Sequence, residues 1–245
     1  MEFKLPTETI ELPSKGLLYP EGHPLASGTI EMKYMTAKEE DILTNQNYIK
    51  NGTVIDKLLK SLIVTEFDYN DLLTGDKNAI MIAARILSYG KDYSVTYNGE
   101  QINVDLSLIE PKEHQVEYTR GENEFEVKLP KSGYGLTFKI LTHGDEVSIE
   151  NEIKGLQKIN KNSSPEVTTR LKHMILSIDG KRERADIRKF VDNYLLAQDA
   201  RALRAEYSRV SPDIDLTFTY ETADGSEEEV AIPITPTFFW PDFGV

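Results

Sequence analysis

The first third of the chain, residues 12–77, constrains the fold most. It begins with a Pro-Ser-Lys-Gly turn at residues 13–16 and continues into residues 30–34, where alternating apolar and polar residues predict a half-buried strand. Patterns typical of three short helices follow the strand, and apolar and polar residues alternate too closely in this region for it to be a linker. No group in this region is arranged for catalysis. The region therefore predicts a part that works by fitting other proteins, and not an enzyme.

Three short helices are expected after this strand. Thr36 and Glu39 have the spacing of a capping box, which predicts a helix that begins at Thr36 and ends at Asn51-Gly52. A second helix is expected over about residues 54–64, with one apolar stripe. A third is expected from near Asp76 to Gly90, where glycine suits a left-handed closing position. Together these helices predict one compact unit.

Hairpin patterns separate the helices. Asn98-Gly99 lies between alternating residues 93–97 and 101–106, which is the strongest hairpin signal in the chain. Val95 and Val104 are expected to form a cross-strand pair. Further strands are expected near residues 115–119, 124–129 and 136–141, and a last hairpin joins residues 215–220 to 229–234.

The second half is mainly helical. Helices are expected over residues 146–161 and from an N-cap at Ser164, and a long helix that can contain one break covers residues 184–209. The apolar stripe of the helix after Ser164 is expected to consist of Val167, Leu171, Met174, Ile175 and Ile178.

These patterns predict an α+β fold, in which helical bundles are interrupted by β-hairpins and a small antiparallel sheet. The expected divisions are residues 1–110, 111–145, 146–212 and 213–245. The C-terminal tail, which crowds aromatic residues into positions 238–243, is expected to be extended because three prolines interrupt it. Its aromatic side chains can pack on the chain itself or anchor an interface.

Composition excludes several functional classes. The net charge of −13 disfavours nucleic acid, because phosphate binding depends on a basic surface. No apolar run reaches the roughly 18 residues of a membrane span, and the N-terminus lacks a signal-peptide pattern, so we expect a cytoplasmic protein. Without cysteine, the chain can form no disulfide or thiolate zinc site. The basic cluster at residues 181–189 predicts a solvated helix face or a protein-docking patch.

Motifs for catalysis are missing. The sequence has no P-loop and no nucleophile elbow, and no two of its four histidines have a metal-binding spacing. We therefore predict no catalytic residue, no cofactor and no metal site. The four histidines are His23, His114, His143 and His173.

Several long strings give the chain a family resemblance. Residues 12–19, 30–45, 72–79 and 84–90, together with Phe239-Trp240-Pro241, resemble the T4-type bacteriophage baseplate hub protein family. Many relatives carry paired cysteines, in the manner of small zinc ribbons, where this chain has residues 97–100 and 222–226. Both hairpins must therefore form here without zinc.

The resemblance implies a non-enzymatic protein of a contractile phage tail. It would act in baseplate central hub assembly, as an assembly chaperone or as a hub subunit. Its partners would be other baseplate hub proteins or tape-measure proteins, with no nucleic acid and no membrane, and no oligomeric state is predicted. It would be located in the host cytoplasm during assembly or in the tail baseplate of the virion.

The predicted interface residues lie in the N-terminal turn and in the aromatic tail. For each of them, stabilisation of the fold itself is the alternative. Two alternatives to the phage-tail function stay open. The protein could be a hydrolase with dispersed carboxylates, or a regulatory protein that binds a host component. The predicted interface residues are Lys15, Gly16, Tyr19, Phe239 and Trp240.

Overall fold

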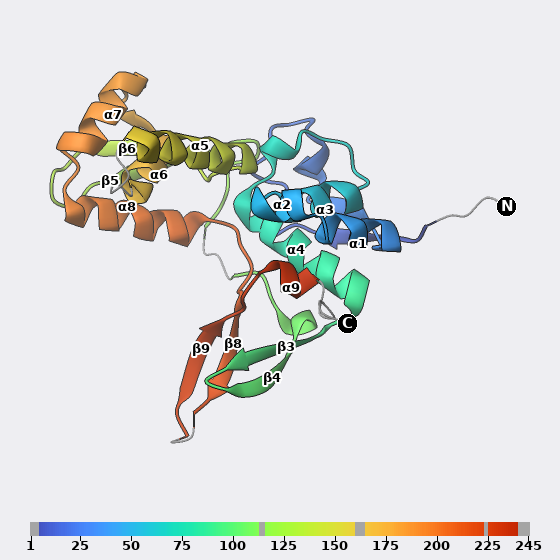
Figure 1. The fold of residues 1–245 in the computed structure, drawn as a ribbon. Coiled ribbons are helices and arrows are strands. Elements are labelled where there is room, and N and C mark those ends of the chain that lie inside the picture. Colours follow the sequence, from blue (N-terminus) through green and yellow to red (C-terminus); the bar gives the residue numbers. More distant parts are fainter. Residues whose placement is uncertain (1–4, 113–115, 160–164, 223–224, 240–245) are drawn as a thin grey trace.

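The computed structural model describes residues 5–112, 116–159, 165–222 and 225–239, and it forms three lobes (Figure 1). The N-terminal lobe runs from the first strand to the long helix α4 (Thr74–Tyr89). The central lobe packs four helices with a three-stranded sheet. The hairpin lobe consists of two β-hairpins that project from the body, with one short helix at their base. The predicted α+β class is confirmed.

The N-terminal lobe combines a two-stranded sheet with a helical layer. Strand β1 (Thr7–Glu11) pairs antiparallel with β2 (Thr29–Lys33), and Ile10 lies opposite Ile30. The core beneath the helices includes buried leucines of α3 (Val54–Leu62) and the apolar residues of β2. The helical elements of this lobe are η1 (Pro24–Ser27), α1 (Ala37–Leu43), α2 (Gln46–Lys50), α3, η2 (Tyr69–Asp71) and α4.

The capping box is confirmed, but the first predicted helix is divided. Glu39 accepts hydrogen bonds from the backbone N–H and hydroxyl of Thr36, at 3.0 and 2.6 Å. The helix stops at Leu43 because the Asn45 side chain accepts hydrogen bonds from two backbone N–H groups that follow it, and so starts α2. A single helix from Thr36 to Asn51 was therefore the wrong prediction.

The central lobe contains a sheet of three antiparallel strands in the order β5 (Phe125–Lys128), β6 (Gly135–Phe138) and β7 (Ile175–Ile178). Strand β7 corrects the prediction that these residues continue a helical stripe, because Ile178 pairs with Leu136 on β6. Residues 116–119 form no strand, against the prediction for 115–119, of which Gln115 lies outside the described residues. The other elements are α5 (His143–Ile159), α6 (Glu166–Met174), α7 (Arg184–Asn193) and α8 (Ala197–Val210).

The outer limits of the long helix predicted over residues 184–209 are confirmed to within one residue. The expected long helix contains one break, between α7 and α8. Helix α6 begins after Pro165, which is its N-cap, whereas the predicted cap Ser164 and the predicted loop at 160–163 lie outside the described residues. None of the helices in the described part of the chain has the length and apolar character needed to span a bilayer.

The hairpin lobe confirms both predicted hairpins. Asn98 and Gly99 adopt φ angles of 50° and 85°, which the tight turn between β3 (Asp92–Tyr97) and β4 (Glu100–Asp105) requires. The predicted cross-strand pair is corrected, because Val95 lies opposite Ile102 and Val104 lies opposite Tyr93. The remaining elements are η3 (Leu106–Leu108), β8 (Thr217–Glu221) and β9 (Glu227–Ala231).

The aromatic tail returns to the body of the protein. Residues Pro236–Phe239 form the short helix α9, which lies against α4 (Figure 1), so the prediction of an extended tail is wrong for this stretch. Phe238 and Phe239 are both fully buried, and the Phe238 ring packs edge-on to Tyr93 at 4.9 Å. Burial of two aromatic rings compensates for closing the chain into this turn. Trp240 lies outside the described residues.

Candidate functional site

The family-like string Gly75-Asp76-Lys77-Asn78 opens helix α4 and forms a polar site that joins several segments of the chain. Asp76 is fully buried, and its carboxylate accepts hydrogen bonds from the backbone N–H and hydroxyl of Ser14, at 2.9 and 2.7 Å. The Tyr19 hydroxyl donates to the same carboxylate at 2.7 Å. We call Asp76, Ser14 and Tyr19 the Asp76 node. It joins the N-terminal turn to α4, two segments that are distant in the sequence.

The Asp76 node is closed by a backbone group. The N–H of Leu73 donates to the Tyr19 hydroxyl oxygen at 3.1 Å, so this hydroxyl both donates and accepts. Burial raises the pKa of Asp76, and the hydrogen bonds from Tyr19 and Ser14 oppose that shift. Burial also raises the pKa of Tyr19. A fully paired buried group of this kind fixes one arrangement of the chain, because any lost partner would leave a buried polar atom unsatisfied.

The other residues of the string hold different segments. A Cβ atom at Gly75 would lie only 1.8 Å from the carbonyl oxygen of Pro212, so the chain passes α4 at a distance that only glycine allows. Asn78 donates to the Asp213 carboxylate at 2.9 Å. Lys77 donates to Asp56 on α3 at 2.6 Å. Four consecutive residues thus fasten the N-terminal turn, α3 and the segment that leads to β8.

The predicted interface residues occupy contrasting positions. Gly16 is buried at φ 73°, and a Cβ atom there would lie 2.5 Å from the backbone nitrogen of Gly28. Tyr19 is buried in the Asp76 node and Phe239 is buried at the end of α9, whereas Lys15 is exposed. The structure therefore gives Gly16, Tyr19 and Phe239 roles inside the fold.

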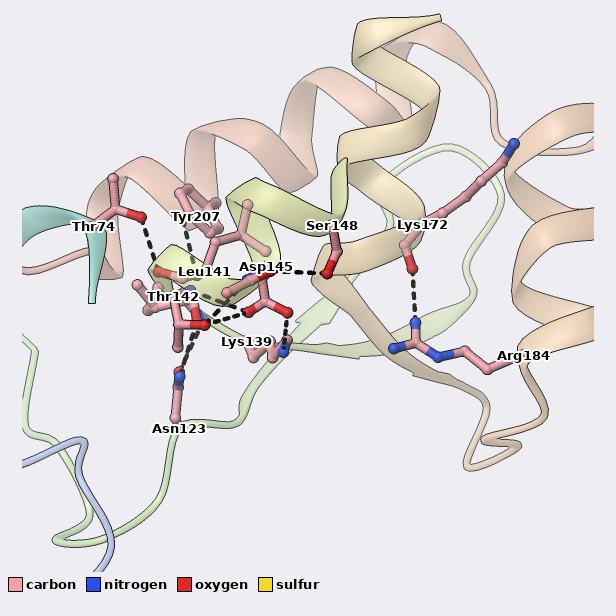
Figure 2. Close-up of polar contacts among 12 residues, drawn as sticks. Thr74, Asn123, Lys139, Leu141, Thr142, Asp145, Ser148, Lys172, Arg184 and Tyr207 are labelled. Atoms are coloured by element: carbon pink, nitrogen blue, oxygen red, sulfur yellow. Dashed lines mark hydrogen bonds and ion pairs between the residues drawn. The ribbon is translucent and has the colours of Figure 1, made fainter. Parts of the chain in front are cut away.

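The N-terminal and central lobes meet at the segment that leads into α5 (Figure 2). Thr74, at the start of α4, donates its hydroxyl and its backbone N–H to the carbonyl of Leu141, at 2.9 and 3.2 Å. The N–H of Leu141 donates in turn to the Tyr207 hydroxyl of α8 at 3.2 Å. Asn123 pairs with both backbone groups of Ile140, at 2.8 and 2.9 Å. One stretch of backbone is thereby held from both lobes.

The start of α5 is fixed in the same place. Asp145 accepts from the backbone N–H of Thr142 at 3.0 Å and from Lys139 at 2.8 Å, and Figure 2 shows these groups gathered around one carboxylate. The N–H of His143 donates to the Leu72 carbonyl at 2.7 Å, directly beside the Asp76 node. The node and the interlobe junction are therefore one continuous framework.

Comparison with known proteins identifies the family. A family model described as T4 bacteriophage base plate protein matches residues 6–240, which is nearly the whole chain. The chain belongs to this family. No curated protein and no solved structure matches it. A baseplate-family protein has a structural role in the phage tail, where it lies among other tail proteins, and the predicted T4-type resemblance is confirmed.

One hollow of this baseplate protein collects titratable side chains. It measures about 420 Å³ and lies where α5 and α6 face the N-terminal lobe. Asp56 is paired with Lys77, and Glu146 is paired with Arg170 through two hydrogen bonds of 2.5 and 2.9 Å. Burial lowers the pKa of His143, whose ring packs edge-on to a tyrosine. The first ion pair lies within the N-terminal lobe and the second within the central lobe. Among the described residues, no group of three or more acids or histidines could hold a metal ion.

The hairpin lobe of this baseplate protein is built differently. Its two hairpins meet through exposed contacts, in which Tyr97 donates to Glu228 at 3.2 Å and Tyr220 donates to Glu100 at 2.9 Å. The rings of Tyr97 and Tyr220 lie 5.1 Å apart, edge to face. These contacts join the hairpins at the surface, whereas the Asp76 node is fully enclosed.

Sequence reasoning missed the central residue of the framework. The sequence predicted only that a helix begins near Asp76, and residues 72–79 were singled out for their family resemblance and not for a buried site. An aspartate in the first turn of a helix is ordinary, since it complements the helix dipole. Its partners Ser14 and Tyr19 lie 62 and 57 residues away, so no local pattern could reveal the node.

Proposed function

We propose that this protein acts in assembly of the baseplate central hub, as an assembly chaperone or as a hub subunit that binds other tail proteins. The observation that carries the proposal is that two of the family-like strings, residues 12–19 and 72–79, converge on the buried Asp76 node and not on a reactive pocket. A buried, fully paired polar group fixes one arrangement of the chain and offers no reactive group, which favours a protein that acts by binding through its shape. Its proposed partners are other hub proteins or tape-measure proteins.

The same geometry supports a role without catalysis. A hydrolase with dispersed carboxylates would need acids or histidines that are free to transfer protons. In the hollow beside α5, the carboxylates of Asp56 and Glu146 are instead engaged by Lys77 and Arg170. We therefore favour shape-matched binding over the enzymatic alternative.

The proposed binding surface must use exposed residues. Lys15 is the member of the N-terminal turn that reaches the surface, and it stands on a backbone held rigid by Gly16 and Ser14. Such a preorganised loop costs little entropy when it binds. Lys15 is therefore our proposed contact in the N-terminal turn. Trp240, which lies outside the described residues, stays a proposed contact on the sequence alone.

Mass spectrometry of purified tails, combined with a deletion phage, tests the proposal. Mass spectrometry should detect the protein in finished tails if it is a hub subunit, and should not detect it if it is an assembly chaperone. For either role, the deletion phage should fail to form hubs. Complementation with the intact chain should restore them. Normal hubs in the deletion phage would contradict the proposal for either role.

A further inference from the structure

The hairpin lobe concentrates the negative charge of the protein. Residues 91–105 and 215–231 contain nine acidic residues and one lysine, so they carry −8 of the net charge of −13. No lysine or arginine follows Arg209 anywhere in the chain. A projecting lobe of one charge sign attracts a partner surface of the opposite sign and repels a second copy of itself.

A groove runs along this lobe between β4 and β8. It measures about 390 Å³ and is lined on one side by consecutive residues 102–105 and on the other by 217–219. Successive residues of a strand point to opposite faces, so a hollow that follows consecutive residues lies along the strand edge. Within the described residues, β4 pairs only with β3 and β8 pairs only with β9. The groove therefore lies between two strand edges that can still accept a partner strand.

The groove has an apolar anchor point and an acidic rim. Leu108 is 75% exposed beside it, a high value for leucine, and Phe218 and Ile102 are half-buried in its wall. Asp215 and Glu229 line the rim, and neither forms an ion pair with any basic side chain in the described part of the chain. A free apolar side chain between unneutralised carboxylates suits a ligand that combines apolar and basic residues.

We propose that this groove binds an extended segment of another tail protein in which lysine or arginine alternates with large apolar residues. Its backbone pairs with a free strand edge, its apolar side chains cover Leu108 and Phe218, and its basic side chains face Asp215 and Glu229. This inference rests on the proposed function, since it names the chemistry of a partner in assembly. A second copy of the chain fits poorly, because its own hairpin lobe is acidic.

Site-specific photo-crosslinking during infection tests the groove. A deletion phage is complemented with the full chain, in which p-benzoylphenylalanine replaces either Leu108 or, as a control, Glu66 on the N-terminal lobe. We expect position 108 to crosslink to a tail protein through a segment rich in alternating basic and apolar residues. The double variant Asp215→Asn/Glu229→Gln should lower this crosslinking about threefold to tenfold.

A matched double variant controls for overall charge. Glu21→Gln/Glu122→Gln removes two exposed carboxylates from outside the hairpin lobe and should leave the crosslinking at position 108 unchanged. Circular dichroism melts should show that both double variants are as stable as the original chain.

The possible failures are distinguishable. Crosslinks to tail proteins from position 66 but not from position 108 would overturn the groove and leave the proposed function standing. A crosslink from position 108 to an acidic segment or to a second copy of this chain would also overturn it, as would equal yields with both double variants. Normal hubs in the deletion phage would overturn the proposed function, and the groove inference with it.

Discussion

The Asp76 node and the hairpin lobe hold this baseplate protein together in opposite ways. In the node, buried donors surround a carboxylate, and every partner lies inside the fold. In the hairpin lobe, tyrosine hydroxyls meet glutamates at the surface, where water competes for each contact. Buried polar contacts define one shape, whereas exposed ones leave a surface that a partner can still reorganise. We infer that the node preserves the framework and that the hairpin lobe presents a second binding surface beside the N-terminal turn.

The largest effect should come from the close approach at α4. Gly75→Ala places a Cβ atom 1.8 Å from the Pro212 carbonyl, so the segment leading to β8 must move, and we expect a loss of about 3 kcal/mol or more in the free energy of unfolding. Urea unfolding measures this loss.

Gly155→Ala is the matched control for that substitution. Gly155 lies exposed within α5, and a Cβ atom there would meet nothing within 4 Å. The change should raise the free energy of unfolding by roughly 0.5–1 kcal/mol, because alanine is the better helix former. Similar losses from both alanines would contradict the packing described at Gly75.

The next effect distinguishes the two kinds of tyrosine contact. Tyr19→Phe removes a donor from Asp76 and leaves the buried N–H of Leu73 without its acceptor, so unfolding should become easier by about 1–3 kcal/mol. Tyr220→Phe removes an equivalent hydroxyl from the hairpin lobe, where water replaces it, and should leave the melting temperature unchanged within error. If Tyr19→Phe and Tyr220→Phe lowered the melting temperature equally, the proposed difference between the buried contacts of the node and the exposed contacts of the hairpin lobe would be contradicted.

A smaller effect concerns the buried carboxylate of the capping box. Burial raises the pKa of Glu39, but hydrogen bonds from Thr36, Lys33 and Ser61 prevail and lower it to about 2, below the ordinary value of 4.5. Its contribution to stability is therefore complete above pH 4.5 and is lost as the pH falls toward 2.

Glu39→Gln isolates this contribution. At pH 7 the variant should lose about 1–2 kcal/mol in the free energy of unfolding. The difference from the original chain should shrink as the pH falls from 4.5 to 2, because protonation then weakens the same contacts in the original chain. Unfolding curves at a series of pH values measure it, and a constant difference would contradict the assignment.

The smallest effect belongs to an exposed carboxylate of the hairpin lobe. The hydrogen bond from Lys91 lowers the pKa of Asp105 to about 2, with further hydrogen bonds from Ser107. Because the pair is exposed, Asp105→Asn should destabilise the protein only slightly, and less again in 1 M salt, where the screening length is about 3 Å. Glu39→Gln, measured beside it, should be nearly independent of salt. A strong salt dependence of Glu39→Gln would show that the two carboxylates do not differ as described.

Local signals explain what could be predicted from the sequence. The capping box at Thr36, the turn at Asn98-Gly99 and the amphipathic pattern of α4 each depend on neighbouring residues, and each appears in the structure. The pairing of β7 with β6 depends on residues about 40 positions apart, so Ile175 and Ile178 matched a helical stripe equally well.

The framework itself could not be predicted in this way. Asp76 gains its role only when Ser14 and Tyr19 arrive from a distant turn, and Gly75 only when Pro212 passes beside it. The tail shows a related limit, because the burial of Phe238 and Phe239 beside α4 outweighed the extended tendency of a proline-containing segment. Tertiary contacts decided both outcomes.

The most direct test of the account compares two variants in two assays. Tyr19→Phe perturbs the node, and Leu108→Ser perturbs the groove of the hairpin lobe. For each, the melting temperature is measured by circular dichroism, and hub formation is measured by complementation of a deletion phage at low temperature, where Tyr19→Phe is still folded. The account predicts that Tyr19→Phe lowers the melting temperature but forms hubs, and that Leu108→Ser melts normally but fails to form them. The reverse pattern would contradict it.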